Sequence, residues 1–364
     1  MTQLNEPRQL TASRVNVYDW LRLIATLLVV IGHSTYLDTT ETYGGILYAL
    51  PENTSPLYFS KIFDFWRNMV TWIYTFHMPL FFMLSGAVLA LKPIKSLGSV
   101  IKSKFIRLLL PYFIYGYLFM FPVKRLGDFY DDASIVLALR GFLLGQDSGH
   151  LWFLPSLFWV TIFFAVIQRP LSKLNIQSGY ALLFLSGVVM ILYTYLPFDV
   201  LFLKHGLTYL FYFTLGYAFE SERQRVSPWS TKTALLTFLA LVALDLVTLR
   251  FNILDTTYLT LSRSLLIYSL AYLLDCIFRN IHQQKWWKVI TRNLFYIYLF
   301  HDPLEYVVIR IFFGTNLLAS PFGCIAYAFC RIVVVTAISI LLGESANYIK
   351  KYQKTCKYLN FKKK

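Results

Sequence analysis

Long apolar runs alternate with short polar connections along almost the whole chain. Many of these runs reach the length of about 20 residues that a helix needs to cross a bilayer. The pattern therefore predicts an all-α integral membrane protein, a bundle of about ten transmembrane helices. In chain order, the expected spans are 17–36, 69–91, 105–122, 151–168, 178–196, 201–219, 233–250, 258–278, 293–313 and 322–346.

The basic residues predict how this bundle is oriented. If every expected span crosses the membrane, most Lys and Arg residues lie in the connections on one side, together with both termini. Cytoplasmic loops carry such an excess, so we expect both termini in the cytoplasm and longer outer loops at about 37–66 and 123–150. Residues 1–350 are expected to form one transmembrane domain, and residues 351–364 a basic cytoplasmic tail. The first apolar run lacks a clear cleavage site and is expected to be retained.

Composition favours the same class of protein. The chain is 57% hydrophobic and only 15% charged, whereas soluble domains carry about 25% charged residues. The net charge of +15 does not indicate nucleic-acid binding, because the basic residues lie between apolar runs and form no basic face. Neither the histidines nor the cysteines have the spacing of a metal site or a disulfide framework, so we expect no metal. The cysteines are Cys276, Cys324, Cys330 and Cys356.

Two ionisable residues, Arg22 and His33, lie inside the first apolar run. Such residues are costly in a membrane and are rarely accidental. They are eleven positions apart, about three helical turns, so they project from nearly the same face, roughly 16 Å apart along the axis. One stripe of one helix is thus expected to carry a permanent cation near the cytoplasmic face and a potential base in the outer half of the membrane.

Three further histidines lie in or beside expected spans: His77, His150 and His301. A buried histidine in a membrane bundle is often a hydrogen-bonding residue between helices. Imidazole can also accept a proton from a hydroxyl near physiological pH, so the set is also consistent with acid–base chemistry. Asp302 and Glu305 follow His301 closely; either of them could orient an imidazole, or could pair with Arg310 or with another span.

Two other features each have a structural and a functional interpretation. Ser85 and Gly86 are better explained as a small-residue notch for close helix packing than as a nucleophile site, because no base adjoins Ser85. Lys104 and Arg107 share a helix face at the start of an expected span. Taken alone, these residues are better explained by positive-inside topology than by a cytoplasmic clamp for phosphate.

Several motifs together resemble the acyltransferase 3 family, whose members include bacterial O-acetyltransferases of surface sugars. Arg22 and His33, after an Asp19-Trp20-Leu21-Arg22 opening, are similar to the family's first-helix signature, an arginine followed eleven positions later by a histidine. The other matching segments are Phe76 to Gly86, similar to a phenylalanine-rich stretch ending in Ser-Gly, then His150-Leu151-Trp152-Phe153-Leu154, and finally Tyr298-Leu299-Phe300-His301. The resemblance covers essentially the whole chain.

This resemblance implies transfer of an acyl group, most simply acetyl, from acyl-CoA to a hydroxyl, commonly on a carbohydrate. Acetyl-CoA is then a donor substrate rather than a bound cofactor. His33 is expected to act as general base and His301 to stabilise the oxyanion or relay the proton, while Arg22, Arg107 and Lys104 bind the donor. The family often has arginine where this chain has Lys104. The lysine ammonium is a compact charge and lacks the forked set of N–H donors of an arginine guanidinium. The remaining candidate site residues are Asp19, His77, Ser85, His150 and Trp152.

The expected location is the inner or plasma membrane of a bacterial cell, with membrane lipids as partners and no nucleic acid. Two other functions stay open from the residues alone. Buried ionisable groups in about ten spans would suit a proton-coupled transporter. A non-catalytic component of a polysaccharide export assembly would not need His33. The acceptor sugar is not named by the sequence, since tyrosines and aspartates in the outer loops suit an interfacial aromatic belt as well as a sugar surface.

Overall fold

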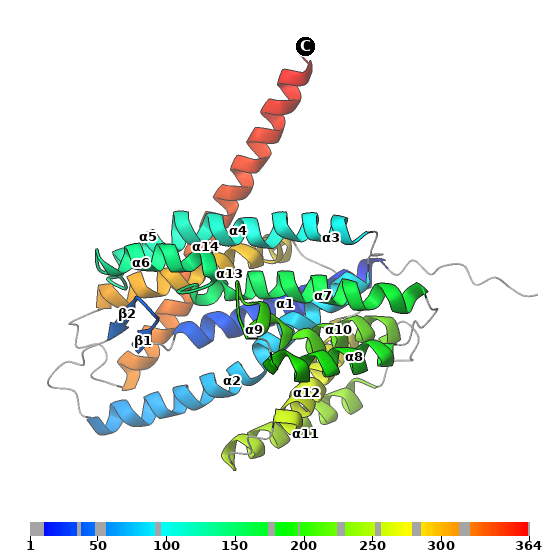
Figure 1. The fold of residues 1–364 in the computed structure, drawn as a ribbon. Coiled ribbons are helices and arrows are strands. Elements are labelled where there is room, and N and C mark those ends of the chain that lie inside the picture. The colour runs from blue at the N-terminus through cyan, green and yellow to red at the C-terminus, as the bar shows by residue number, and fades with distance from the viewer. Residues whose placement is uncertain are drawn as a thin grey trace, which may run out of the picture. The chain divides into compact units, whose positions relative to one another are not determined.

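The fold is almost entirely helical (Figure 1). The computed structural model describes residues 11–34, 38–47, 56–91, 96–173, 179–195, 197–223, 230–251, 256–278, 285–312 and 321–362. The prediction of an all-α protein is confirmed in substance, with one small exception. Two short strands, β1 (Asp38–Thr40) and β2 (Gly45–Leu47), pair as an antiparallel hairpin in which Asp38 lies opposite Leu47.

The helices coincide with the apolar runs of the sequence. In chain order they are α1 (Thr11–Ser34), α2 (Pro56–Ala90), α3 (Leu97–Lys104), η1 (Phe105–Leu109), α4 (Leu110–Tyr115), η2 (Gly116–Met120), α5 (Phe121–Leu126), α6 (Ser134–Gly141), η3 (Phe142–Leu144), η4 (Gly149–Trp152), α7 (Phe153–Lys173), α8 (Gly179–Leu192), η5 (Tyr193–Tyr195), α9 (Leu203–Leu207), α10 (Leu210–Arg223), α11 (Thr231–Arg250), α12 (Thr256–Phe278), α13 (Lys285–Phe312) and α14 (Pro321–Lys362). Here η1 and η2 are π-helical, whereas η3, η4 and η5 are 3-10 turns.

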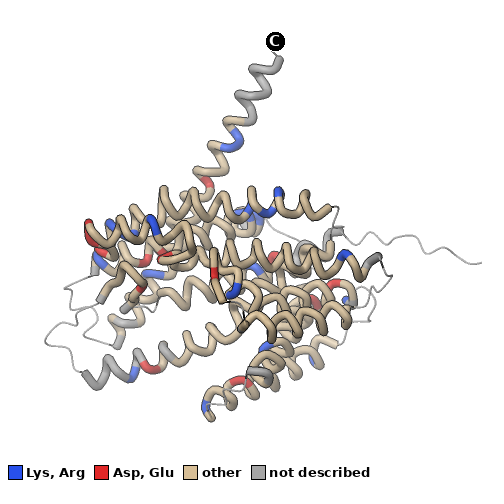
Figure 2. The backbone as a smooth tube through the Cα atoms, in the orientation of Figure 1, with Lys and Arg blue, Asp and Glu red and all other residues tan. Residues whose placement is uncertain are grey.

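Seven helical segments in the described part of the chain are long and apolar enough to cross a membrane. Three expected spans correspond to helices that do not meet this measure. α8 and α10 each have 14 residues, and α13 has 28 residues but carries several charged side chains. A multi-pass membrane protein is therefore supported, while the count of about ten spans and the cytoplasmic termini stay predictions. In Figure 2 most of the tube is tan, because acidic and basic residues are sparse along the long helices.

The two long outer connections expected from the sequence contain regular structure. The first, at 37–66, holds the β1–β2 hairpin and the beginning of α2. The second, at 123–150, holds the end of α5, all of α6 and two 3-10 turns. The apolar residues of α6 include the buried Ala138, so this segment packs against neighbouring residues.

The chain divides into two compact units. The first unit comprises Met1–Ala25, Thr71–Tyr112 and Trp152–Gln284, and the second comprises Thr26–Val70, Phe113–Leu151 and Lys285–Lys364. α14 continues as one helix through residue 350, where the basic tail is expected to begin. The predicted single domain with a separate tail remains untested.

Close helix contact in the first unit depends on two glycines. A Cβ atom at Gly86 of α2 would lie 1.8 Å from the carbonyl oxygen of Phe213 on α10, and a Cβ at Gly216 would lie 1.7 Å from the carbonyl oxygen of Met83. Ser85 donates its hydroxyl hydrogen bond to the Phe81 carbonyl one turn earlier, at 2.8 Å. The two backbones meet where only glycine fits, as expected for a small-residue notch.

In the second unit, α13 packs along α14 and also against α5. The β1–β2 hairpin is attached to the segment after α5, because Gly45 donates its backbone N–H to the Phe129 carbonyl at 2.9 Å. Gly44 also packs so closely against the Phe129 and Tyr130 rings that a Cβ there would lie 2.4 Å from Tyr130. These contacts place the turn between the two strands beside the buried polar residues of α5 and α13.

Candidate active site

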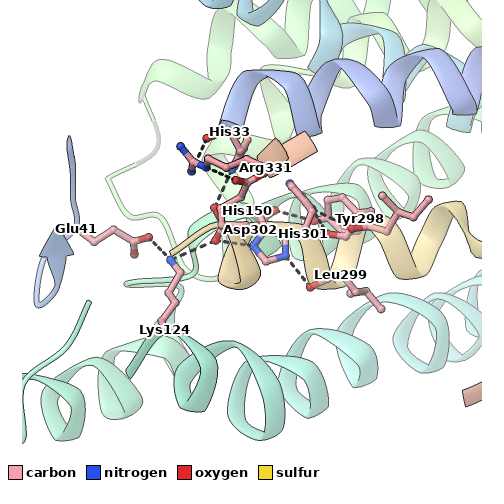
Figure 3. A network of polar contacts seen from close by, with 11 residues as sticks. His33, Glu41, Lys124, His150, Tyr298, Leu299, His301, Asp302 and Arg331 are labelled. Carbon is pink, nitrogen blue, oxygen red and sulfur yellow. Dashed lines mark hydrogen bonds and ion pairs between the residues drawn. The ribbon is translucent and has the colours of Figure 1, made fainter. Parts of the chain in front are cut away.

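The Asp302 carboxylate is the centre of a buried polar network in the second unit (Figure 3). Asp302 lies on α13 and is 2% exposed. Its Oδ1 atom lies 2.8 Å from Nδ1 of His33. Its Oδ2 atom lies 3.1 Å from Nδ1 of His150 and 3.4 Å from Nζ of Lys124. One acid thus joins two imidazoles and a cation that come from α1, η4 and α5.

The contact with Asp302 fixes the tautomer of His33. An ionised carboxylate only accepts hydrogen bonds, so Nδ1 of His33 carries the proton and donates it. In the neutral ring, Nε2 then has the lone pair and can act as a base. His33 lies in the last turn of α1, and its side chain is 13% exposed. A carboxylate that orients a histidine in this way also stabilises the imidazolium formed when the ring takes a proton.

His150 faces hydrogen-bond acceptors with both ring nitrogens. Nε2 lies 3.1 Å from the Leu299 carbonyl oxygen, while Nδ1 faces Asp302. The Tyr298 hydroxyl donates to the backbone carbonyl of His150 at 2.7 Å. The Leu299 carbonyl only accepts, so Nε2 of His150 carries a proton and donates it. Nδ1 lies beside the Asp302 carboxylate but makes no hydrogen bond among the described residues.

In His301, Nδ1 and not Nε2 is the ring nitrogen that faces backbone carbonyl oxygens. Its Nδ1 atom lies 2.8 Å from the Tyr298 carbonyl oxygen and 3.1 Å from that of Ile297, so it donates to the preceding helical turn. Its Nε2 atom is buried and has no hydrogen-bond partner within the described residues. The ring lies edge-on to His33 and His150, with centroid separations of 4.9 and 5.0 Å. A neutral His301 thus offers a buried acceptor next to both other imidazoles.

Lys124 is completely buried and supplies positive charge to this network. Besides Asp302, its Nζ atom contacts Oε1 of Glu41 at 3.1 Å, from the turn between β1 and β2. The ammonium group also lies 4.3 Å from the centroid of the Phe129 ring. Gly149 has a φ of 47°, and a Cβ there would lie 2.8 Å from Nζ of Lys124. The backbone at Gly149 therefore packs closely against this ammonium group. The positive charge of Lys124 favours the ionised form of the Asp302 carboxyl.

The side chain of Arg331 on α14 forms hydrogen bonds with the C-terminal end of α1. Its guanidinium donates to the Ser34 carbonyl at 2.7 Å and to the His33 carbonyl at 3.3 Å. Its Nε atom lies 2.5 Å from Oε2 of Glu305, and the arginine side chain is fully buried. The last carbonyls of a helix lack partners within the helix, so Arg331 caps α1 and fixes the position of His33.

These contacts resolve the sequence alternatives for the two acids after His301. Asp302 does orient an imidazole, that of His33, which is distant in sequence. Glu305 pairs with Arg331 on another helix, and not with Arg310, which pairs with Asp128 at 2.9 Å.

Sequence reasoning missed Lys124, Glu41 and Arg331. Arg331 alone gave a usable signal, because an arginine inside the expected span 322–346 is costly unless it is paired within the bundle. Lys124 and Glu41 fall in segments expected to be outer loops, where charged residues are ordinary.

The proposed donor-binding residues lie in the first unit. Arg22 pairs with Asp19, with NH1 3.2 Å from Oδ1, and its side chain is 42% exposed. Lys104 ends α3 and lies within electrostatic range of Arg107, which is exposed in the π-helical segment η1. Two neighbouring cations are favourable where an anion binds between them. α1 runs unbroken from Arg22 to His33, as the spacing of the pair requires.

The remaining candidates, His77 and Trp152, also belong to the first unit. His77 is buried, and its Nδ1 atom lies 2.9 Å from the Ile73 carbonyl oxygen in the preceding turn. Trp152 lies edge-on to His205 with ring centroids 4.6 Å apart, and at 5.8 Å from Tyr209. In the part of the chain that the structure describes, no group of three His, Cys, Asp or Glu side chains is arranged to hold a metal ion.

Comparison with known families decides the class of protein. A family model described as an acyltransferase domain matches residues 15–344, nearly the whole chain. The chain belongs to the acyltransferase 3 family. No curated protein and no solved structure gives a significant match. As an acyltransferase 3 protein with several helices of membrane-spanning length, it is a membrane acyltransferase.

Proposed function

We propose that this protein transfers an acyl group, most simply acetyl, from acyl-CoA to a hydroxyl of a cell-surface or extracellular carbohydrate. The observation that carries the proposal is the 2.8 Å contact between His33 and Asp302 in a buried network. Together with the family, it supports His33 as general base. The proposed setting is the inner or plasma membrane of a bacterial cell.

His33 would take the proton from the acceptor hydroxyl as its oxygen attacks the thioester carbonyl of the donor. The carbon–oxygen bond forms, and the tetrahedral intermediate then breaks its carbon–sulfur bond. The coenzyme A thiolate leaves and takes the proton back from the His33 imidazolium. Asp302 stabilises that imidazolium during the step. Proton removal by a positioned histidine contributes about 10²–10⁴ in rate.

His301 would serve as a second proton acceptor in this scheme. Its Nδ1 atom is committed to backbone carbonyls, and its buried Nε2 atom has no partner among the described residues. A neutral ring in this state accepts a hydrogen bond and does not donate one from Nε2. Proton relay therefore suits His301 better than stabilisation of an oxyanion, which requires a donor.

The donor would enter from the cytoplasmic side. Arg22, Arg107 and Lys104 would hold the phosphates and other anionic parts of coenzyme A, whose charge is complementary to theirs. Arg22 precedes His33 by about three turns of one continuous helix, which offers a length comparable to that of the pantetheine arm. Arginine binds phosphate with a fork of N–H groups, so we expect Arg107 to contribute more than Lys104.

The test is a transfer assay with the purified full-length protein in lipid nanodiscs, labelled acetyl-CoA and carbohydrate extracted from cells that lack the protein. We expect labelled carbohydrate with the wild type and a loss of transfer in His33→Ala with acetyl-CoA binding retained. Wild-type transfer activity in a correctly folded His33→Ala protein would exclude His33 as the base.

A second function is favoured by one observation, the concentration of buried ionisable side chains around Asp302. Groups of this kind also form proton pathways in carriers. Measuring proton flux in vesicles separates the two functions. Flux coupled to movement of a substrate, without labelled product, would indicate a transporter, and the absence of both would indicate a non-catalytic component of an export assembly.

A further inference from the structure

The turn of the β1–β2 hairpin supplies a charged side chain to the buried network of the second unit (Figure 3). Glu41 follows β1, and its Oε1 atom lies 3.1 Å from Nζ of Lys124. Backbone contacts fix the turn without that carboxylate. The N–H of Glu41 donates to the Gly44 carbonyl at 2.8 Å, and the N–H of Tyr43 donates to Oδ1 of Asp147 at 3.3 Å. The charge of Glu41 is therefore not needed to hold the hairpin in place and calls for another explanation.

Two carboxylates share the ammonium group of Lys124. Its Nζ atom lies 3.1 Å from Oε1 of Glu41 and 3.4 Å from Oδ2 of Asp302. The lysine side chain is completely buried, whereas that of Glu41 is 17% exposed. A Cβ atom at Gly149 would lie 2.8 Å from Nζ, 3.3 Å from the Glu41 oxygen and 3.4 Å from the Asp302 oxygen. The three charges are thus confined to one place, where they interact at short range.

The negative charge that acts on His33 depends on how Lys124 is shared. Oδ1 of Asp302 lies 2.8 Å from Nδ1 of His33. A carboxylate stabilises a neighbouring imidazolium through its charge, and a cation at its other oxygen opposes that effect. Without Glu41, the charge of the ammonium group would act mainly on Asp302. Glu41 is the nearer of the two carboxylates, so it offsets the ammonium charge most directly.

Other titratable groups face this set from the neighbouring elements. Around His33 they are His150, His301 and the oppositely charged pair of Glu305 and Arg331. Around Glu41 and Lys124 they are Asp147, Tyr130 and Tyr306. The tyrosines are neutral near neutral pH, because a phenol ionises at a pH of about 10. Asp147 is a second acid beside Glu41, so the test includes a variant at that position.

We propose that Glu41 is a positioning residue of the transfer reaction, which acts on His33 through Lys124 and Asp302. By sharing the ammonium charge, Glu41 leaves more of the Asp302 charge to stabilise the His33 imidazolium. This inference rests on the proposed function, in which His33 is the general base. Glu41 touches neither the donor nor the acceptor in this scheme.

Two simpler roles of Glu41 lead to different measurements. An ion pair that only supports the fold would change stability, while the pH dependence of the rate would stay that of the wild type. A carboxylate that accepts a hydrogen bond from the acceptor would lower KM for the acceptor, and its loss would raise that KM at every pH. A charge that acts on His33 instead moves the acid limb of the pH profile, because the neutral imidazole is the active form.

The experiment measures kcat/KM against pH for full-length variants in lipid nanodiscs, with labelled acetyl-CoA and carbohydrate extracted from cells that lack the protein. Glu41→Gln removes the charge and keeps the shape, and Glu41→Asp keeps the charge. Glu41→Gln is also combined with Asp147→Asn, so that Asp147 cannot take over the lost charge, and separately with Lys124→Met, which removes the cation. Tyr43→Phe is the matched control from the same turn, since its exposed hydroxyl contacts Gln146.

We expect Glu41→Gln to move the half-maximal pH of the acid limb down by about 0.5–1 unit, the effect of one charge at this range in a protein interior. The imidazolium is less stabilised, so the ring loses its proton at lower pH. The rate at high pH should fall about two- to tenfold, because a weaker base removes the acceptor proton less readily. Adding Asp147→Asn should give a shift at least as large. Glu41→Asp and Tyr43→Phe should keep the wild-type profile, and Lys124→Met added to Glu41→Gln should move the limb back to higher pH.

NMR titration of the full-length protein with labelled histidine measures the protonation of His33 itself. The His33 signal is the one that disappears in His33→Ala. Glu41→Gln should move its titration in the same direction and by the same amount as the acid limb.

The outcomes separate this inference from the proposed function. An acid limb within about 0.2 pH units of wild type in folded Glu41→Gln with Asp147→Asn would overturn the role of Glu41 and leave the acyltransferase function standing. A raised KM for carbohydrate at every pH, without movement of the limb, would overturn it as well. If the His33 titration moves while the limb stays, His33 is not the base, and the base assignment fails together with this inference. A wild type that transfers no acetyl to carbohydrate would refute the proposed function, and the role of Glu41 would fall with it.

Discussion

His33 and Asp302 are 269 residues apart in the sequence, yet Nδ1 of the histidine lies 2.8 Å from Oδ1 of the aspartate. The end of α1 thereby meets the middle of α13 at a buried acid–base pair. The pair has the chemistry required of an oriented general base, since the carboxylate selects the tautomer in which Nε2 carries the lone pair. Its consequences for activity can be tested by replacing either partner.

Asp302→Asn should reduce the transfer rate by roughly 10²–10⁴. The amide no longer stabilises the imidazolium and can present its N–H₂ group to His33, which favours the wrong tautomer. Acetyl-CoA affinity should not change, because the donor-binding residues lie elsewhere. Single-turnover transfer and equilibrium binding of acetyl-CoA measure the two effects, and Asp302→Glu serves as a control that keeps the charge. A rate within a factor of about three of wild type in folded Asp302→Asn would contradict the pairing.

Arg331→Met tests whether the buried guanidinium positions His33. Removing one member of a buried ion pair leaves Glu305 uncompensated, and this should cost about 3–5 kcal/mol of stability. The double variant Arg331→Met with Glu305→Gln should recover much of that stability. It should still transfer slowly, because the His33 and Ser34 carbonyls have lost their donor. Chemical unfolding and steady-state kinetics measured together distinguish positioning from stability, and full recovery of the rate in the double variant would leave Arg331 with a structural role only.

Gly149→Ala addresses the confined space around Lys124. The glycine has a φ of 47°, and an added Cβ would lie 2.8 Å from Nζ of Lys124. We expect a loss of about 1–3 kcal/mol from backbone strain, together with displacement of the ammonium group from Asp302. Gly98→Ala is the control, since a Cβ at Gly98 of α3 meets nothing within 4 Å. That substitution should stabilise the helix by up to about 1 kcal/mol. Thermal unfolding in nanodiscs measures the stability change in both variants. An equal change in Gly149→Ala and Gly98→Ala would argue against a confined site around Lys124.

Gly86→Ala tests the packing explanation of the Ser85–Gly86 segment. The new methyl group would meet the backbone of Phe213, which cannot rotate away, so α2 and α10 must separate. We expect destabilisation of at least about 2 kcal/mol, in the range of overpacked cores. Gly187→Ala on α8 provides the comparison, because its nearest neighbour is the Phe211 ring at 3.8 Å. Ser85→Ala should retain activity, and its complete loss in a folded protein would restore the nucleophile interpretation.

The sequence predicts the helices well, because the apolar runs have the length and composition that a bilayer requires. It also identifies His33 and His301, whose polarity is conspicuous within such runs. It does not reveal that Asp302 serves His33, because the pairing depends on how α1 meets α13 and has no local signature. Lys124 is hidden for another reason: nothing in a segment expected to be a loop indicates that its ammonium group will be completely buried.

Arg22→Ala should separate donor binding from chemistry. The guanidinium is partly exposed and is paired with Asp19 on the same helix, so its removal should leave the fold and the His33 network intact. Loss of a charge-assisted contact to phosphate should weaken acetyl-CoA binding by roughly 10–100-fold, with a much smaller change in the rate at saturating donor. Arg22→Lys should recover part of the affinity, since charge remains while the forked geometry is lost. Calorimetric titration with acetyl-CoA and with dephosphorylated coenzyme A measures this directly. Unchanged affinity in Arg22→Ala would remove Arg22 from the donor site, and an equal loss of rate at saturation would instead place it with the reacting groups.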